Sequence, residues 1–154
     1  METIRVRRAK PRDLAGVAAM AHSLWPDGAV SEHAAQFAAY IAGDGPGELP
    51  DAIFVAEDPA GSLVGFAHAG LRSHADGCDP SHPVGYLEGW YVAPSHRRMR
   101  VGAQLVAAAE GWARSLGCRE MASDTWIDSF DSQQAHQALG YEVVDRCVHY
   151  RKNL

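Results

Sequence analysis

Apolar and polar positions alternate along this chain with two periods, one typical of strands and one typical of helices. Ile4 and Val6 alternate with charged neighbours, which predicts a short first strand. Two amphipathic helices are expected next, the first beginning near Pro11 and the second capped by Ser31. Residues 25–28, with the sequence Trp-Pro-Asp-Gly, separate the two helices because proline and glycine interrupt helical structure.

The second half of the chain reads as further strands and two further helices. A long helix is expected after the turn that follows the strand ending at residue 92, and Gly117 is expected to stop it. Its predicted inner face carries Val101, Leu105, Ala108, Trp112 and Leu116. A short helix is expected over residues 132–139, closed by Gly140. The remaining predicted strands are residues 52–57, 63–71, 84–92, 118–123, 141–144 and 147–151.

This order of elements predicts the fold class. Strands and helices follow one another as β-α-α-β-β-β-α-β-α-β-β, which favours an α/β (α+β) fold with helices on both faces of a mixed, mostly antiparallel central sheet. A chain of 154 residues suits one domain, and we expect it to span residues 1–154.

Composition narrows the setting in which the protein works. Hydrophobic residues make up 47% of the chain and charged residues 21%, as in ordinary globular proteins. No apolar run approaches the roughly 20 residues of a membrane span, and the N-terminus lacks the apolar core of a signal peptide. The three cysteines are too far apart for a metal site or a disulfide framework, which favours the cytoplasm. The histidines have no metal-ligand spacing either, so no metal is expected.

The charge balance points away from nucleic acid. Nineteen acidic residues against 14 basic ones give a net charge of −5, whereas nucleic-acid binding needs a basic face. An acidic protein is compatible with a cationic substrate, which carboxylates can pair with and steer.

One unbroken stretch, Tyr86 to Leu105, carries the clearest chemistry. It reads as a strand, a turn with three arginines, and the start of a helix. Free backbone N–H groups and the positive end of the dipole at a helix N-terminus suit a pyrophosphate. The stretch resembles the acetyl-CoA-binding motif of the GCN5-related N-acetyltransferase superfamily, whose turn has Arg or Gln, two residues, Gly, one residue, then Gly or Ala. Arg97 to Gly102 matches this pattern, except that Arg100 stands where the first glycine is expected.

The resemblance implies acetyl-CoA as cosubstrate. It also implies a set of cofactor-binding residues around the motif. These are Trp90, Tyr91, Val92, Arg97, Arg98, Met99, Arg100, Val101, Gly102, Ala103 and Ser129.

Four further segments make the resemblance narrower. Together they are similar to the aminoglycoside 6'-N-acetyltransferases, which implies a cationic aminoglycoside as acceptor, antibiotic resistance as outcome and a homodimer as assembly. The segments are Leu-Trp-Pro ending at 26, Leu-Glu-Gly at 87–89, Cys-Arg-Glu-Met-Ala-Ser-Asp-Thr at 118–125 and Gln-Ala-His-Gln-Ala-Leu-Gly-Tyr at 134–141.

Several residues are candidates for the acceptor side, because ammonium groups need carboxylates and an aromatic surface. Glu88 stands among apolar neighbours where a surface strand would alternate, which favours a functional role. Asp124 is interpreted as a substrate contact, although aspartate also caps turns. Asp145 can be a substrate contact or a surface residue. Trp25 can form a wall under a sugar ring or anchor the core.

His136 occupies the place where many acetyltransferases have a tyrosine that protonates the departing thiolate. It can donate a proton, contact the cofactor, or face solvent on its helix. We expect direct acetyl transfer in a ternary complex, with Glu88 or Asp124 taking the amine proton through ordered water. Two alternatives stay open: acetyl transfer to another small amine or a protein N-terminus, and a non-catalytic ligand-binding module suggested by Arg100 in the turn.

Overall fold

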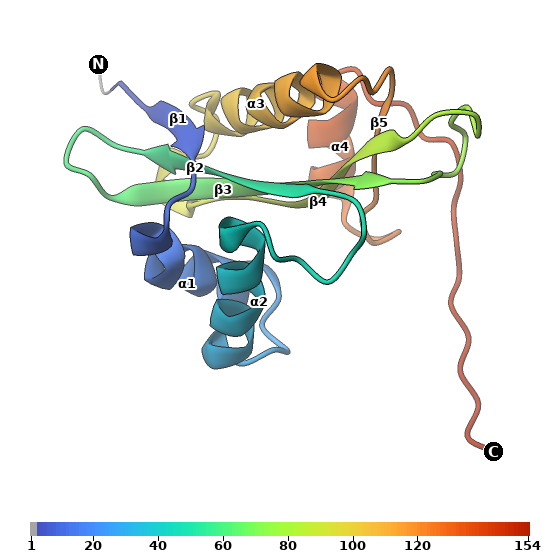
Figure 1. The fold of residues 1–154 in the computed structure, drawn as a ribbon, viewed down its shortest axis with the longest axis horizontal. Helices are drawn as coiled ribbons and strands as arrows, with labels where there is room; N and C mark the ends of the chain where they lie inside the picture. The colour runs from blue at the N-terminus through green and yellow to red at the C-terminus, as the bar shows by residue number, and fades with distance from the viewer. Residues whose placement is uncertain (1–2) are drawn as a thin grey trace.

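The computed structural model, which describes residues 3–154, places helices on both faces of one five-stranded sheet (Figure 1). The strands lie in the order β1-β2-β3-β4-β5, with antiparallel pairing up to β4 and parallel pairing between β4 and β5. The mixed, mostly antiparallel sheet predicted from the sequence is therefore confirmed. The strands are β1 (Arg5–Arg8), β2 (Asp51–Glu57), β3 (Leu63–Arg72), β4 (Val84–Val92) and β5 (Met121–Ser123).

The helices divide between the two faces of the sheet (Figure 1). The helices α1 and α2 cover one face, and α3 and α4 lie on the other. No helix of residues 3–154 is long and apolar enough to cross a membrane. The helical elements are η1 (Pro11–Asp13), α1 (Leu14–Leu24), α2 (Val30–Ala42), η2 (Pro94–His96), α3 (Val101–Ser115) and α4 (Phe130–Ala138).

Each face of the sheet has its own apolar core. Ile53, Phe66 and Phe37 are buried between the sheet and the α1–α2 pair. On the other face, Leu105 of α3 and its neighbours are buried between this helix and the sheet. The predicted inner face of α3 was partly wrong: the buried stripe continues through Ala109 and Ala113, whereas Leu116 lies after the last helical residue and is exposed.

Two predictions concerned helix ends: the stop at Gly117 was confirmed and the cap at Ser31 was not. Gly117 adopts a positive φ of 88° just after α3, a conformation that glycine reaches without the steric penalty of a Cβ. The predicted cap at Ser31 was wrong, because the N–H groups of Glu32 and His33 bond to the carbonyl of Ala29. Helix α2 thus begins at Val30 and Ser31 lies inside it.

The C-terminal segment differs most from the sequence prediction. The strands expected over residues 141–144 and 147–151 are absent, and the segment extends away from the body of the protein (Figure 1). A strand needs a neighbour for its backbone hydrogen bonds, and the segment passes beyond the sheet. Apolar side chains are exposed as a result, with Val148 at 65% and Tyr150 at 92%.

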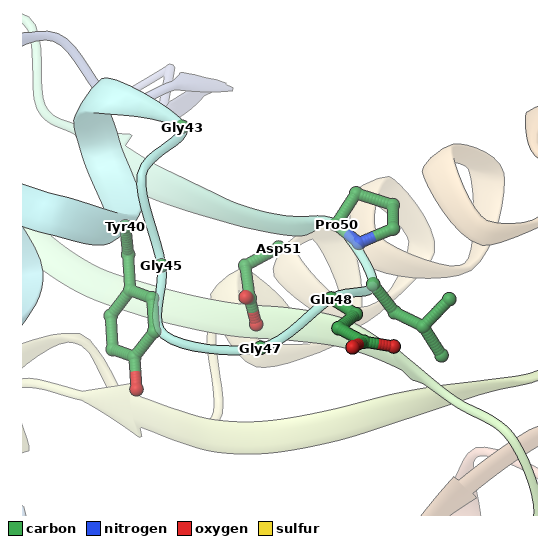
Figure 2. A pocket seen from close by; sticks show the side chains of 8 residues that line it. Tyr40, Gly43, Gly45, Gly47, Glu48, Pro50 and Asp51 are labelled. Atoms are coloured by element: carbon green, nitrogen blue, oxygen red, sulfur yellow. The ribbon is translucent and has the colours of Figure 1, made fainter.

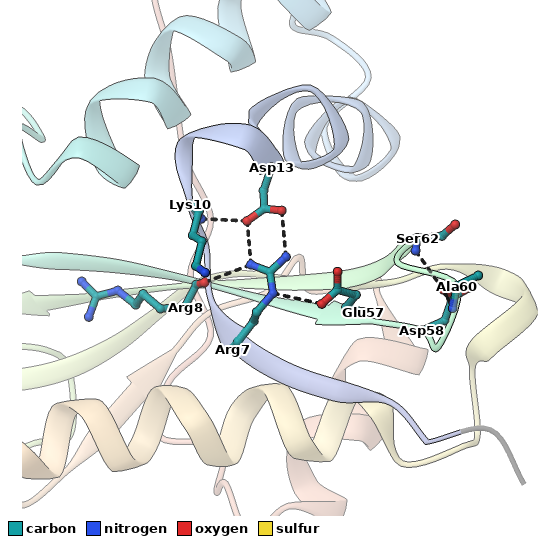
Figure 3. A network of polar contacts seen from close by, with 8 residues as sticks. All are labelled: Arg7, Arg8, Lys10, Asp13, Glu57, Asp58, Ala60 and Ser62. Atoms are coloured by element: carbon teal, nitrogen blue, oxygen red, sulfur yellow. Dashed lines mark hydrogen bonds and ion pairs between the residues drawn. The ribbon is translucent and has the colours of Figure 1, made fainter.

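A buried ion-pair network joins β1 to the start of the first helix (Figure 3). The guanidinium of Arg7 donates to both carboxylate oxygens of Asp13, at 2.7 and 2.9 Å, and to Glu57 at 3.1 Å. Asp13 also accepts the backbone N–H of Lys10 at 2.7 Å. Its hydrogen bond with Arg7 holds the pKa of Asp13 below its usual value, against the opposing effect of burial.

Candidate functional site

A β-bulge sets the direction of the Glu88 side chain. In the β3–β4 pairing, Ala69 lies opposite Leu87 and His68 lies opposite Gly89, so Glu88 is the extra residue of β4. A bulge changes the local twist of a strand and redirects the side chain that it carries. The apolar neighbours of Glu88, which break the expected alternation in the sequence, are thus explained by this bulge.

Strands β4 and β5 separate immediately beside this bulge. Their parallel pairing ends at Leu87 and Ser123, and β4 then continues alone on this edge to Val92. Within the described residues no other strand pairs with the 88–92 edge. Backbone groups of this edge therefore remain candidates for binding a ligand.

One polar network brings Glu88 and Asp124 together. Arg72 donates from Nε and Nη2 to the two oxygens of Glu88, at 2.9 and 2.7 Å. Its guanidinium lies 3.5 Å from the ring centroid of Tyr86, and the Tyr86 hydroxyl donates to Asp124 at 2.9 Å. The hydrogen bond to Glu88 raises the pKa of Arg72, while burial and then the bond to Asp124 raise that of Tyr86.

Arg72 and Tyr86 were not among the site residues predicted from the sequence. Arg72 directly follows one predicted strand and Tyr86 lies within another, but only the sheet register brings them to the two carboxylates.

Trp25 lies directly over the bulge. A Cβ at residue 89 would stand only 2.6 Å from Cη2 of Trp25, so Gly89 is needed for this close approach. The indole also contacts the edge of the Phe66 ring, with centroids 6.3 Å apart. Trp25 thus packs against the α1–α2 core and lies over Gly89, the residue next to Glu88. Its role under a sugar ring stays a prediction.

A cavity of about 240 Å³ lies on the same face of the sheet, between the end of α2 and the start of β2 (Figure 2). Tyr40, Glu48 and Asp51 line it together with the glycine-rich loop 43–50. Asp51 hydrogen-bonds to Nε2 of the buried His68 at 2.9 Å. Burial raises the pKa of Tyr40, and the charges of Asp51 and Glu88 raise it further. The face that carries Glu88 is therefore acidic well beyond the two predicted carboxylates.

His136 is a residue of α4, and its ring lies against Trp90 of β4 and Ser123 of β5. Its Nδ1 is 2.7 Å from the Ser132 carbonyl, which can only accept, so Nδ1 carries the hydrogen. In the neutral ring Nε2 then accepts from the Ser123 hydroxyl at 2.8 Å. The ring contacts Trp90 and Tyr141 edge-on and is half-buried, so the solvent-facing alternative was wrong.

The basic turn before α3 has two residues in the left-handed region. Arg98 and Arg100 both have φ of 64°, so the position where the motif has glycine does need a positive φ. Arg97 donates from Nε to the carbonyl of Val92 at 2.9 Å, which ties the turn to β4. Hydrogen bonding back to Arg100 begins with Gln104 at 3.1 Å. The amides of residues 101–103 are thus the N-terminal donors that a helix leaves unsatisfied.

Gly102 lets the helix start close to β4, because a Cβ there would lie 3.0 Å from the Trp90 indole. The turn therefore combines free amides, the positive end of the α3 dipole and exposed arginines. These features fit the anionic pyrophosphate of acetyl-CoA.

The other candidates lie in different places. Tyr91 packs toward the α1–α2 core, Met99 is exposed in the turn, and Ser129 immediately precedes α4. Asp145 lies exposed in the C-terminal segment, where its carboxylate accepts the backbone N–H of Arg146 at 2.7 Å. Because the two strands expected around Asp145 are absent, the structure does not bring it to the Glu88–Asp124 network.

Comparison with known proteins gives a consistent picture. The model of the Acetyltransferase (GNAT) family matches residues 17–141. The chain is 42% identical over 149 residues to an aminoglycoside N(6')-acetyltransferase type 1 of Klebsiella aerogenes, covering 97% of this chain and 96% of that protein.

Solved structures agree over the whole length. An AAC(6')-Iy structure in complex with the bisubstrate analogue CoA-S-monomethyl-acetylneamine has a TM-score of 0.86 at 37% identity, covering 99% of both chains. The 6'-N-acetyltransferase AAC(6')-Ih from Acinetobacter baumannii has a TM-score of 0.85 at 27% identity, also covering 99% of both chains. With a family model over most of its length and a close full-length relative, the chain belongs to the acetyltransferase (GNAT) family.

Proposed function

We propose that this protein is an aminoglycoside 6'-N-acetyltransferase that uses acetyl-CoA and confers resistance to these antibiotics. The observation that carries the proposal is the full-length similarity to proteins of this name, one of which is solved with a CoA–acetylneamine bisubstrate analogue. The acidic sheet face with Glu88, Asp124 and Asp51 supports a polycationic acceptor, because desolvated ammonium groups need carboxylate partners.

The acceptor must reach the reaction as a free amine. A simple alkylamine resembles lysine, with a pKa of about 10.4, and its ammonium form has no lone pair for attack. We assign deprotonation to Glu88 or Asp124, acting through ordered water. The shared network through Arg72 and Tyr86 supports both carboxylates as members of one site. Trp25 supplies the apolar wall beside them.

Acetyl-CoA supplies the activated acetyl group. The amides of residues 101–103 and the arginines of the turn would hold its pyrophosphate. The unpaired β4 edge at residues 90–92 would orient the thioester and polarise its carbonyl, an effect worth roughly 3 kcal/mol in other enzymes. His136 could pass a proton toward the departing thiolate only as an imidazolium, whose Nε2–H would donate to the Ser123 hydroxyl; in the neutral ring Nε2 accepts from that hydroxyl and carries no proton.

We also propose that the protein works as a homodimer in the cytoplasm. The extended C-terminal segment supports the dimer, because its exposed Val148 and Tyr150 would be covered if the segment packed on a second copy. Cys78, Cys118 and Cys147 are free thiols, in keeping with a reducing compartment.

A thiol-release assay with acetyl-CoA and a panel of amines tests the function. The panel holds kanamycin, an analogue with a 6'-hydroxyl in place of the amine, a polyamine and a peptide N-terminus. We expect release with kanamycin and no N-acetyl product from the hydroxyl analogue, since a site built for an amine discriminates strongly against its replacement. Mass spectrometry and NMR of the product should locate the acetyl group on the 6'-nitrogen. Release with the polyamine or the peptide but not with kanamycin contradicts the proposal.

A further inference from the structure

Arg72 occupies an unexpected place for an acceptor site that handles cations. It is the last residue of β3, and its guanidinium satisfies both oxygens of Glu88 while stacking on Tyr86. A fixed positive charge therefore stands beside the carboxylate that an acceptor ammonium needs. Two cations cannot share one carboxylate closely without mutual repulsion.

The burial of this ion pair differs from that of the Arg7 network (Figure 3). The side chains of Arg7 and Asp13 are 9% and 6% exposed, whereas those of Arg72 and Glu88 are 44% and 27% exposed. Breaking a buried pair leaves an uncompensated charge in the core, but an exposed pair contributes little to stability. The Arg72–Glu88 pair is partly exposed, so opening it should cost the fold much less than opening the Arg7–Asp13 pair.

The position of Arg72 also gives its side chain room to move away. Residue 72 ends β3 and is followed by the 73–83 segment, which is largely exposed. The guanidinium stacks on the Tyr86 ring and donates hydrogen bonds to Glu88. Its release would leave Glu88, Tyr86 and Asp124 in place for another cation.

We propose that Arg72 is an internal counter-cation that mimics the acceptor in the free protein and must be displaced by it. This inference rests on the proposed function. A polycation gains further contacts on the acidic face through its other ammonium groups, which favours the exchange, whereas a monoamine only replaces one ion pair by another. Arg72 therefore determines specificity by selecting against amines with a single charge.

Steady-state kinetics of Arg72→Gln test this role with two probes, kanamycin and 6-amino-6-deoxyglucose, which carries one methylene-borne amine. We expect at least a threefold lower KM for kanamycin with kcat within twofold of wild type. For the monoamine, kcat/KM should rise at least fivefold, so that the selectivity between the probes narrows. Arg72→Lys keeps the charge but not the two-pronged bond and should fall between the two proteins.

Arg114→Gln is the matched control, because it removes the same charge from an exposed residue at the far end of α3. It should behave as wild type with both probes. In Arg72→Gln, a kcat more than twofold below wild type, or a KM for kanamycin that is unchanged or higher, would overturn the inference. The lower kcat would make Arg72 a positioning residue for Glu88. If the wild-type protein acetylates no aminoglycoside, the proposed function is refuted instead. That result comes from the wild-type protein alone and does not depend on the Arg72 variants.

A second measurement uses the unaltered protein. The side-chain Nε–H signal of Arg72 in a ¹⁵N NMR spectrum can be assigned by its loss in Arg72→Lys. Saturating the CoA-bound protein with kanamycin should shift this signal and speed its exchange with water. An unchanged signal at saturation would show that Arg72 stays on Glu88 and would overturn the inference.

Discussion

Arg100 is expected to have two opposing effects: its backbone strain lowers the stability of the fold, and its charge favours cofactor binding. Two substitutions can separate these effects. Its φ of 64° places a residue with a Cβ in the left-handed region, while its charge stands at the N-terminus of α3. Arg100→Ala removes the guanidinium and keeps the backbone strain. Arg100→Gly removes both.

The size of the difference follows from the conformation. Left-handed backbone costs a residue with a Cβ about 1–2 kcal/mol. Glycine relieves that strain but makes the unfolded chain more flexible, which offsets about 0.4–1 kcal/mol. The Gly variant should therefore be more stable than the Ala variant by about 1 kcal/mol. In a domain of this size that corresponds to a Tm difference of about 3 °C.

The two variants should agree in their affinity for acetyl-CoA. If the guanidinium binds phosphate, both lose it equally, and Kd should rise about tenfold in each, the equivalent of about 1.4 kcal/mol. Calorimetric unfolding gives the Tm and isothermal titration gives the Kd. Arg98→Gly is a matched control for the strain, because Arg98 has the same φ of 64°.

The outcomes that refute this reasoning are distinct. Equal Tm values for the Gly and Ala variants would mean that the turn stores no strain at residue 100. A wild-type Kd in both variants would mean that the side chain does not touch the cofactor, and only the backbone amides would remain as phosphate ligands.

Three further predictions concern the acceptor site, the fold and the assembly. Glu88→Gln and Asp124→Asn should each lower kcat/KM at least tenfold, about 1.4 kcal/mol, with little change in Kd for acetyl-CoA; wild-type kinetics in both would remove them from the site. Asp13→Asn should destabilise the fold by about 3 kcal/mol in chemical denaturation, because it leaves Arg7 with Glu57 as its remaining carboxylate. The folded pKa of Asp13 is lowered, so its contribution is complete above about pH 4 and is lost as the pH falls further; a variant that keeps the wild-type acid dependence contradicts this. If the protein forms the proposed homodimer through its C-terminal segment, deleting residues 145–154 should give a folded monomer in analytical ultracentrifugation, whereas an unchanged mass would exclude this segment from the interface.

The sequence by itself determined the elements whose signals are local. The strand-like apolar runs at residues 52–57, 63–71 and 84–92 predicted β2, β3 and β4 to within one residue at each end. The basic turn and Gly117 predicted where α3 lies, because helix ends depend on nearby backbone conformation, although the helix ends at Ser115 and does not include the predicted Leu116. Resemblance at a few segments was enough to name the acetyltransferase fold.

Tertiary structure decided what depends on register and on neighbours. The bulge that redirects Glu88, and the Arg72–Tyr86 link to Asp124, exist only because β3 pairs with β4 in one register. The prediction of strands over residues 141–144 and 147–151 was wrong because strand formation also depends on neighbouring strands. Their apolar alternation favours a strand, but a strand forms only where another supplies hydrogen-bond partners, and within residues 3–154 the segment after Gly140 meets none. The apolar pattern of a segment can be read from the sequence, whereas the strand that pairs with it is set by the folded arrangement of the whole chain.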